Sequence, residues 1–217
     1  MLKLSLDSQS DLPYRILCLG AHSDDIEIGC GGTILSLIQK HRDTNVCWVV
    51  FGANEERALE ARMSADRILE RAGSRTIIVK DFRDSFFPFV GFSIKEYFEQ
   101  LKKEFSPDLI FTHYRNDLHQ DHRLISELTW NTFRDHLILE YEIPKYDGEL
   151  GSPNVFVHLD EDVIGTKINV ILECFKSQVC NHWFSEALFK SILRLRGIEC
   201  NAPEGFAEAF YCRKIVI

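Results

Sequence analysis

The chain has 217 residues, 45% of them hydrophobic and 27% charged, which is typical of a single globular domain that can bury a full core. Its formal net charge of −8 argues against a nucleic-acid partner, because a surface that follows phosphates needs clustered lysine and arginine. No apolar run approaches the roughly 20 residues that span a bilayer, and the N-terminal segment lacks the pattern of a signal peptide. We therefore expect a cytoplasmic protein without a membrane span.

The seven cysteines do not predict a zinc ribbon or a thioredoxin-type site, because none of them forms a C-x-x-C pair. Cys18 and Cys47 lie inside apolar runs, where a thiol usually behaves as a small buried hydrophobic group. A catalytic cysteine is not expected.

Apolar runs of strand length alternate with helical patterns through the first 134 residues. The expected strands cover residues 15–20, 45–52, 76–79 and 108–112. The expected helices cover residues 33–41, 55–72, about 94–105 and about 122–134. Strands separated by helices in this way indicate a mainly parallel sheet covered on both faces.

The rest of the chain predicts further elements of the same kinds. Strands are expected at 137–143, 155–159 and 211–217, and helices at 163–175 and 185–196. We predict a Rossmann-like α/β fold with three layers (α/β/α) and strand order 3-2-1-4-5. The whole chain, 1–217, is expected to be one domain, in which about 145–217 is a C-terminal elaboration that completes the substrate site.

Two polar clusters follow two of the expected strands directly. The first reads Ala21-His-Ser-Asp-Asp-Ile-Glu27, followed by Gly29-Cys-Gly-Gly-Thr33. The second reads His113-Tyr-Arg-Asn-Asp-Leu-His-Gln-Asp-His-Arg123. In the predicted strand order, the first and fourth strands are neighbours, and their carboxyl ends form the crevice where ligands bind. The glycines are expected to turn the backbone from strand to helix and to leave room for a substrate.

The residue types in these clusters suit a metal ion. Imidazole and carboxylate groups are good zinc ligands, and a catalytic zinc site usually has three protein ligands. His22 and Asp25 can supply two, and a histidine of the second cluster can supply the third. Asp24, beside Asp25, can act as a base toward water, whose pKa a bound zinc ion lowers to about 7.

The two clusters together resemble the motifs of the PIG-L/LmbE family of zinc-dependent N-deacetylases. That family's motifs read roughly A-H-P-D-D-x-E-x-G-x-G-G and H-x-x-x-D-x-H-x-D-H-R. The resemblance continues in Arg62 on the second helix, in Lys176-Ser-Gln178 and in Phe206-Ala-Glu-Ala-Phe210. It therefore spans most of the chain and implies a metal-dependent hydrolase that removes an acetyl or other acyl group from the nitrogen of an amino sugar or sugar conjugate.

The resemblance also implies roles for individual residues. His22, Asp25 and His122 would bind one zinc ion per chain, and Asp24 would be the general base. His119 would stabilise the oxyanion, with Asp121 as its carboxylate partner, and either Asp24 or His119 would be the general acid. The partner would be a small N-acetylated sugar, and a homo-oligomer is a reasonable expectation from the family.

This sequence departs from the family pattern at two positions. Ser23 stands where the family usually has proline, which removes a rigid element but no functional group. Asp117 fits the wider family pattern, but some members have a tyrosine near the substrate at that place, so we expect the oxyanion contact of that tyrosine to be missing or supplied elsewhere. The resemblance also implies that Arg62 and Asp117 contact the substrate.

Structural roles remain open for several of these residues. Asp24 and Asp25 could cap the following helix, and the histidines of the second cluster could form a solvated helix start. Glu27 is expected to anchor the loop, and His113 to pack the loop or contact the ligand. The remaining histidines have no polar cluster around them and are expected to be ordinary; these are His41, His136, His158 and His182.

Two other functions remain alternatives. One is a metallohydrolase acting on another bond, such as a phosphoester, although two-metal phosphatases need more carboxylates than this sequence offers. The other is a non-catalytic, Rossmann-like module that binds a sugar nucleotide. The aromatic segment 82–89 is expected to border the site. The loops 82–92 and 114–118 and the C-terminal elaboration are expected to set the specificity.

Overall fold

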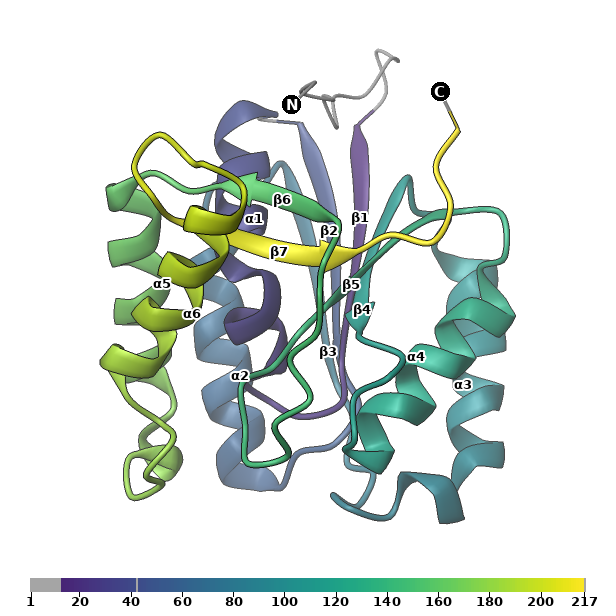
Figure 1. The fold of residues 1–217 in the computed structure, drawn as a ribbon. Helices are drawn as coiled ribbons and strands as arrows, with labels where there is room; N and C mark the ends of the chain where they lie inside the picture. Colours follow the sequence, from purple (N-terminus) through teal and green to yellow (C-terminus); the bar gives the residue numbers. More distant parts are fainter. Residues whose placement is uncertain (1–12, 42, 217) are drawn as a thin grey trace.

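The computed structural model describes residues 13–41 and 43–216, and within them the strands form one sheet with the order β3-β2-β1-β4-β5-β7-β6 (Figure 1). The strands are β1 (Tyr14–Gly20), β2 (Thr44–Val50), β3 (Ser74–Val79), β4 (Leu109–His113), β5 (Leu137–Tyr141), β6 (Val155–His158) and β7 (Ala207–Tyr211). The pairs among β1 to β5 are parallel, whereas β7 pairs antiparallel with both β5 and β6. The predicted α/β fold class and the order 3-2-1-4-5 are confirmed.

Helices cover both faces of this sheet (Figure 1). They are α1 (Asp25–Lys40), α2 (Glu55–Ile68), α3 (Gly91–Glu104), α4 (Gln120–Thr132), α5 (Glu161–Cys174) and α6 (Glu186–Glu199), with short 3₁₀ turns η1 (Phe87–Phe89) and η2 (Lys176–Gln178). Alternate residues of β1 face opposite layers, as the pleat of a strand requires. Ile16 and Cys18 belong to the core beneath α1, α2 and α5, and Leu17 and Leu19 belong to the core beneath α3 and α4.

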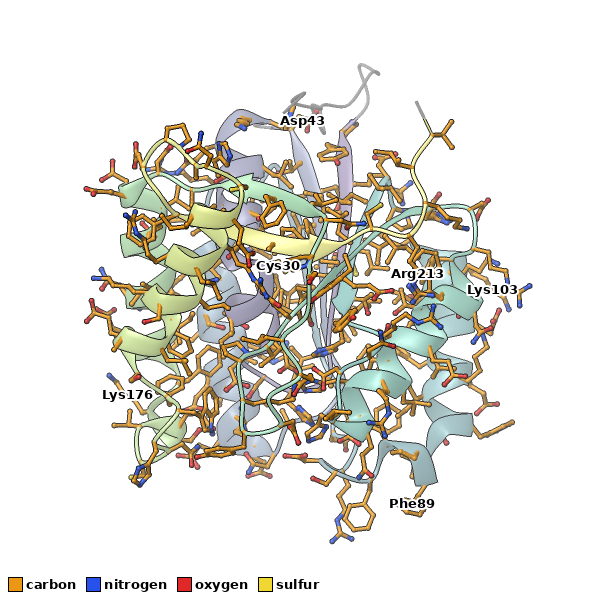
Figure 2. All side chains as sticks on the ribbon, viewed as in Figure 1. Cys30, Asp43, Phe89, Lys103, Lys176 and Arg213 are labelled. Carbon is orange, nitrogen blue, oxygen red and sulfur yellow. The ribbon has the colours of Figure 1, made fainter. Side chains whose placement is uncertain are left out.

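Side chains fill the space between the sheet and the helices and also project from the surface (Figure 2). Cys30 of α1 is buried in the interior, whereas Lys103 and Lys176 lie at the edges of the molecule. Cys18 and Cys47 are also buried and unbridged, as expected for small hydrophobic groups. In the described part of the chain, no helix has the length and apolar character needed to cross a membrane.

The glycine-rich segment after β1 forms a helix rather than the expected turn. Helix α1 starts at Asp25, before the glycines, and none of the three has a positive φ. They serve close packing instead, since a Cβ on Gly29 would lie 2.2 Å from Cδ2 of Tyr141, and one on Gly32 would lie 2.7 Å from Cδ1 of Leu159. The prediction of a turn and of a helix confined to 33–41 was therefore wrong, because tertiary packing outweighs the low helix propensity of glycine.

The last strand also differs from the prediction. It runs from Ala207 to Tyr211 rather than over 211–217, and Ile217 lies outside the described residues. Glu208 in the middle of β7 is buried, which makes the segment a poor match to an apolar strand. Its carboxylate is paired with Lys167 Nζ at 2.6 Å and accepts the backbone N–H groups of Gly32 and Thr33 in α1. The buried charge is therefore satisfied by partners far away in the sequence.

Candidate metal centre

The two polar clusters meet at the carboxyl ends of β1 and β4. These strands are neighbours in the sheet, with Cys18 opposite Phe111. The first cluster forms the short loop between β1 and α1, and the second forms the loop from β4 into α4. Strand pairing therefore brings together side chains that are about a hundred residues apart in sequence.

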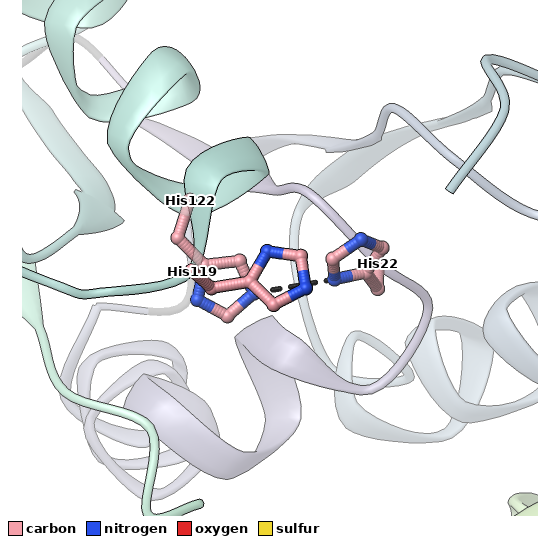
Figure 3. Close-up of side chains that lie close together, drawn as sticks. All are labelled: His22, His119 and His122. Atoms are coloured by element: carbon pink, nitrogen blue, oxygen red, sulfur yellow. Dashed lines mark hydrogen bonds between the residues drawn. The ribbon is translucent and has the colours of Figure 1, made fainter. Parts of the chain in front are cut away.

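His22, Asp25 and His122 converge at this point. His22 Nδ1 lies 3.2 Å from His122 Nε2, and these atoms lie 3.6 Å and 3.5 Å from the two oxygens of the Asp25 carboxylate. All three side chains are buried, with exposed fractions of 9% or less. Figure 3 shows the rings of His22 and His122 facing each other, with His119 beside them.

Neighbouring carboxylates orient both rings. Asp117 Oδ2 lies 2.9 Å from His122 Nδ1, and Asp121 Oδ2 and Asp84 Oδ1 lie 3.2 Å and 3.1 Å from His22 Nε2. Each of these ring nitrogens therefore donates its hydrogen to a carboxylate. This leaves His22 Nδ1 and His122 Nε2 as the nitrogens that face Asp25, the arrangement in which metal-binding histidines are usually held.

The electrostatics of the cluster favour a positive charge between the two rings. Burial and the neighbouring His113 lower the pKa of His122 to about 3, so this ring is neutral. Burial also acts to lower the pKa of His22, but the hydrogen bonds to Asp121 and Asp84 outweigh it and raise that pKa to about 10. The carboxylates around the cluster therefore favour a positive charge at the point where the two rings and Asp25 converge. This donor set, two imidazoles and one carboxylate, fits a zinc ion.

Two further histidines belong to the same cluster. His22, His119 and His122 have ring nitrogens close enough to share an ion, as do His113 and His122 with Asp25. The His113 ring is fully buried and stacks on that of His122 with centroids 3.9 Å apart. Its Nε2 accepts the N–H of Ala21 at 2.9 Å, so His113 packs and fixes the first loop.

Asp24 is held by an arginine that the sequence did not single out. Arg57 Nη2 donates to Asp24 Oδ1 at 2.8 Å, and Arg57 Nε donates to the hydroxyl of Ser23 at 2.6 Å. Asp24 occupies the N-cap position of α1, yet its side chain makes no capping hydrogen bond. Burial raises the pKa of Asp24, and the Arg57 guanidinium opposes that shift.

Arg62, the arginine expected near the substrate, lies elsewhere on the same helix. It is exposed, and its guanidinium donates to the carbonyl of Ile77 at 3.3 Å. Arg57 instead shares the inner face of α2 with Ala61 and Ser64, four and seven residues further on. That spacing was the available signal for Arg57, because residues four and seven apart lie on one side of a helix.

The second cluster differs from the expected pairing in one respect. His119 is the N-cap residue of α4, and its Nδ1 accepts the N–H of Asp121 at 3.3 Å. The Asp121 carboxylate does not pair with His119, because it accepts from His22 and from the backbone N–H groups of Ser85 and Phe87. Asp121 therefore orients His22 and holds the loop after β3 against α4.

Asp117 and Glu27 are both buried beside the cluster of histidines and aspartates. Asp117 is 1% exposed, and its oxygens accept from His122, from the N–H of His119 and from Lys145. Asp117 is therefore bound to partners inside the protein, and its expected contact with a substrate remains a prediction. Glu27 is buried under α2, where the Ser64 hydroxyl donates to it, which agrees with its expected anchoring role.

The aromatic segment after β3 reaches the cluster as well. Asp84, whose side chain is 60% exposed, contacts His22, and the buried Phe87 ring lies 5.8 Å from the His22 ring. Ser85 adopts φ 68°, a conformation uncommon for residues other than glycine, and its N–H donates to Asp121 at 2.6 Å. The segment 82–89 was expected to border the site, but no motif singled out Asp84 itself, because its position depends on this long-range attachment.

Solved structures share this fold at low sequence identity. The N,N'-diacetylchitobiose deacetylase of Pyrococcus horikoshii is 21% identical, with a TM-score of 0.69 over 92% of this chain and 83% of that one. A zinc-inhibited form of teicoplanin deacetylase is 17% identical, with a TM-score of 0.70 over 91% and 97%. The 4-carboxy-2-hydroxymuconate hydratase of Pseudomonas putida KT2440 is 15% identical, with a TM-score of 0.70 over 94% and 98%.

The sequence itself matches a family model, described as GlcNAc-PI de-N-acetylase, over residues 17–133. That segment is more than half of the chain and contains both polar clusters. The resemblance seen in the two motifs is thereby confirmed, and the chain belongs to the PIG-L family of deacetylases.

Proposed function

We propose that this protein is a zinc-dependent deacetylase that hydrolyses the N-acetyl group of a small amino sugar or sugar conjugate. The observation that carries the proposal is the convergence of His22 Nδ1, His122 Nε2 and the Asp25 carboxylate within 3.6 Å of one another. These residues would hold one zinc ion. When bound, zinc supplies Lewis acidity, which polarises a carbonyl group and acidifies water.

The chain's own residues would then move the protons. Asp24, held by Arg57, accepts a proton from the attacking water and can return it to the departing nitrogen when the amide bond breaks. His119 Nδ1 already accepts a backbone N–H, so its Nε2 carries the hydrogen and can donate to the carbonyl oxygen as negative charge develops there. Residues from about 145 to 217 are proposed to complete the substrate site.

The test is an amine-release assay of the zinc-loaded protein on a panel of N-acetylated amino sugars and sugar nucleotides. We expect free amine and acetate in equal amounts from at least one of them, and loss of the activity when a chelator removes the metal. If the purified protein binds no metal, the deacetylase proposal fails and the non-catalytic binding module is the remaining alternative. Metal bound but no amine released from any N-acyl compound would contradict the deacetylase.

A second candidate reaction comes from the hydratase among the similar structures. It would add water to a carbon–carbon double bond rather than to an amide, and it could use the same base and the same metal. The assay therefore includes a panel of unsaturated hydroxy acids, followed by the loss of their ultraviolet absorbance. Turnover of these compounds without amine release would favour the hydratase.

A further inference from the structure

A lysine from the C-terminal part of the chain lies directly behind the candidate metal centre. Lys145 Nζ donates to Asp117 Oδ2 at 2.8 Å, and the same oxygen lies 2.9 Å from His122 Nδ1. The other oxygen of Asp117 accepts the N–H of His119 at 2.7 Å. Lys145 is outside the segment that matches the family model, so the match says nothing about its role.

The ammonium group of Lys145 is enclosed by acceptors. Its side chain is 13% exposed and also donates to Glu149 and, at 3.4 Å, to the carbonyl of Ile143. Glu149 is itself only 11% exposed. A charged amine is costly to remove from water unless ionic and hydrogen-bonding partners replace the water. Here two carboxylates replace it, and one of them is the group that orients a proposed zinc ligand.

We infer that Lys145 is a positioning residue of the metal centre: it fixes the Asp117 carboxylate in the orientation that holds the His122 ring toward His22 and Asp25. The inference rests on the proposed function, because it concerns the same site. A lysine that only tied down the loop 143–149 would be satisfied by Glu149 alone. The sharing of Asp117 Oδ2 between Lys145 and His122 is what connects this loop to the cluster.

The geometry also explains why Asp117 needs a second fixed partner. A carboxylate that accepts from one ring nitrogen can swing about its own side-chain bonds, and the ring can follow it. With Lys145 on one oxygen and the N–H of His119 on the other, Asp117 has one orientation left. Groups that orient a metal ligand typically change metal affinity about 10–100-fold when they are removed.

The experiment measures zinc and cobalt affinity by calorimetry and the His122 tautomer by ¹H–¹⁵N NMR, in the full chain. Lys145→Met should weaken zinc binding about 10-fold or more and reduce the Nδ1–H form of His122. Lys145→Arg should recover much of the zinc affinity and of the Nδ1–H form of His122, because a guanidinium can still donate to Asp117. Glu149→Gln should leave both close to wild type, since it spares the contact with Asp117.

Lys190→Met is the matched control, because Lys190 is exposed on α6 and pairs only with Glu186 in the described structure. Wild-type zinc affinity together with a wild-type His122 signal in Lys145→Met would overturn the inference. If the wild-type protein binds no metal, the proposed function fails, and the His122 tautomer in the metal-free variants still decides the role of Lys145. If Lys145→Met does not fold, Lys145→Gln takes its place, because it removes the charge with less loss of polarity. The same changes in zinc affinity and in the His122 tautomer are then expected of it.

Discussion

At the scale of single residues, two carboxylates that are adjacent in sequence have different surroundings. Asp25 faces the imidazole nitrogens of His22 and His122, whereas Asp24 accepts a hydrogen bond from Arg57. Adjacent side chains at the start of a helix point about 100° apart, so neighbours in sequence can serve separate roles. This divergence is the structural basis for assigning one to the metal and the other to the base.

Asp24→Asn should keep the metal and lose turnover. The amide has nearly the shape of the carboxylate but cannot take a proton from water, and general-base catalysis contributes about 10²–10⁴-fold. Zinc content by mass spectrometry and the amine-release rate measure the two properties separately. Hydrolysis at the wild-type rate by this variant would show that Asp24 is not the base.

Arg57→Met should lower kcat by about 10-fold or more while zinc affinity stays within a few-fold of wild type. The guanidinium holds Asp24 and Ser23, not the groups proposed to bind zinc. Arg62→Met is the control on the same helix, because Arg62 is exposed and bonds only to a backbone carbonyl among the contacts described. Equal loss of activity in both variants would mean that Arg57 acts through the stability of α2 alone.

The sequence predicted the residues of the cluster better than it predicted their partners. The two motifs named His22, Asp25 and His122, and the structure brings these side chains together, while their role as zinc ligands remains a prediction. Arg57 offered only the signal of its helical spacing, and Asp84 had no motif of its own. The contacts of Arg57 with Asp24 and of Asp84 with His22 depend on long-range packing that no local pattern encodes. The expected pairing of Asp121 with His119 failed for the same reason, since the loop after β3 supplies competing donors.

At the scale of elements, helix α1 depends on contacts from the C-terminal part of the chain. The carbonyl of Ile28 accepts from Lys167 Nζ at 2.7 Å, and the N–H of Gly32, four residues later, donates to Glu208 at 2.8 Å. Lys167 and Glu208 are themselves paired at 2.6 Å, so one buried ion pair joins α5 and β7 to one turn of α1. The register of α1, and with it the position of Asp25, is thus fixed from outside the helix.

Lys167→Met should destabilise the fold by about 3–5 kcal/mol, because it leaves Glu208 buried without its counter-ion. Urea unfolding followed by circular dichroism measures the change. Lys190→Met removes an exposed lysine instead and should stay within about 0.5 kcal/mol of wild type. A similarly small change in Lys167→Met would show that hydrogen bonds from the backbone of α1 satisfy Glu208 without the lysine.

Element types were predictable wherever the local pattern agreed with the final packing. The parallel strands β1 to β5 each contain an apolar run, and the structure places them within a few residues of the predicted bounds. Helix α1 and strand β7 were misplaced because their sequences contain glycines or a buried glutamate whose partners are distant: Tyr141, Leu159 and Lys167. Such pairings become visible only when the layers are assembled.

At the scale of the whole molecule, the candidate metal centre joins segments that are far apart in the sequence. The cluster draws on the loops after β1, β3 and β4 and, through Lys145, on the loop after β5. A ligand that bridges such segments binds the folded protein and not the unfolded chain, and it therefore stabilises the fold by mass action.

Zinc at about 100 times its dissociation constant should add about 2.7 kcal/mol to the free energy of unfolding. Thermal unfolding with and without zinc, in wild type and in His122→Ala, measures this gain. His122→Ala should lose the zinc-dependent gain in stability. His182→Ala should keep the full gain, because His182 is an exposed histidine remote in sequence from both clusters. An equal gain in His122→Ala would place the stabilising ion elsewhere.

The insertion of β7 between β5 and β6 has a consequence for how the protein is made. A ribosome releases the chain from its N-terminal end, so the parallel strands and α1 emerge long before Glu208, which lies 176 residues beyond its partner Gly32. Until then β5 is an open sheet edge, which can pair with other chains. The N–H groups of Gly32 and Thr33 in α1 also lack the Glu208 carboxylate that accepts them in the finished fold. A nascent or truncated product that stops short of Ala207 therefore carries the complete histidine and aspartate motifs but lacks the contacts of Glu208 with α1 and leaves the edge of β5 exposed.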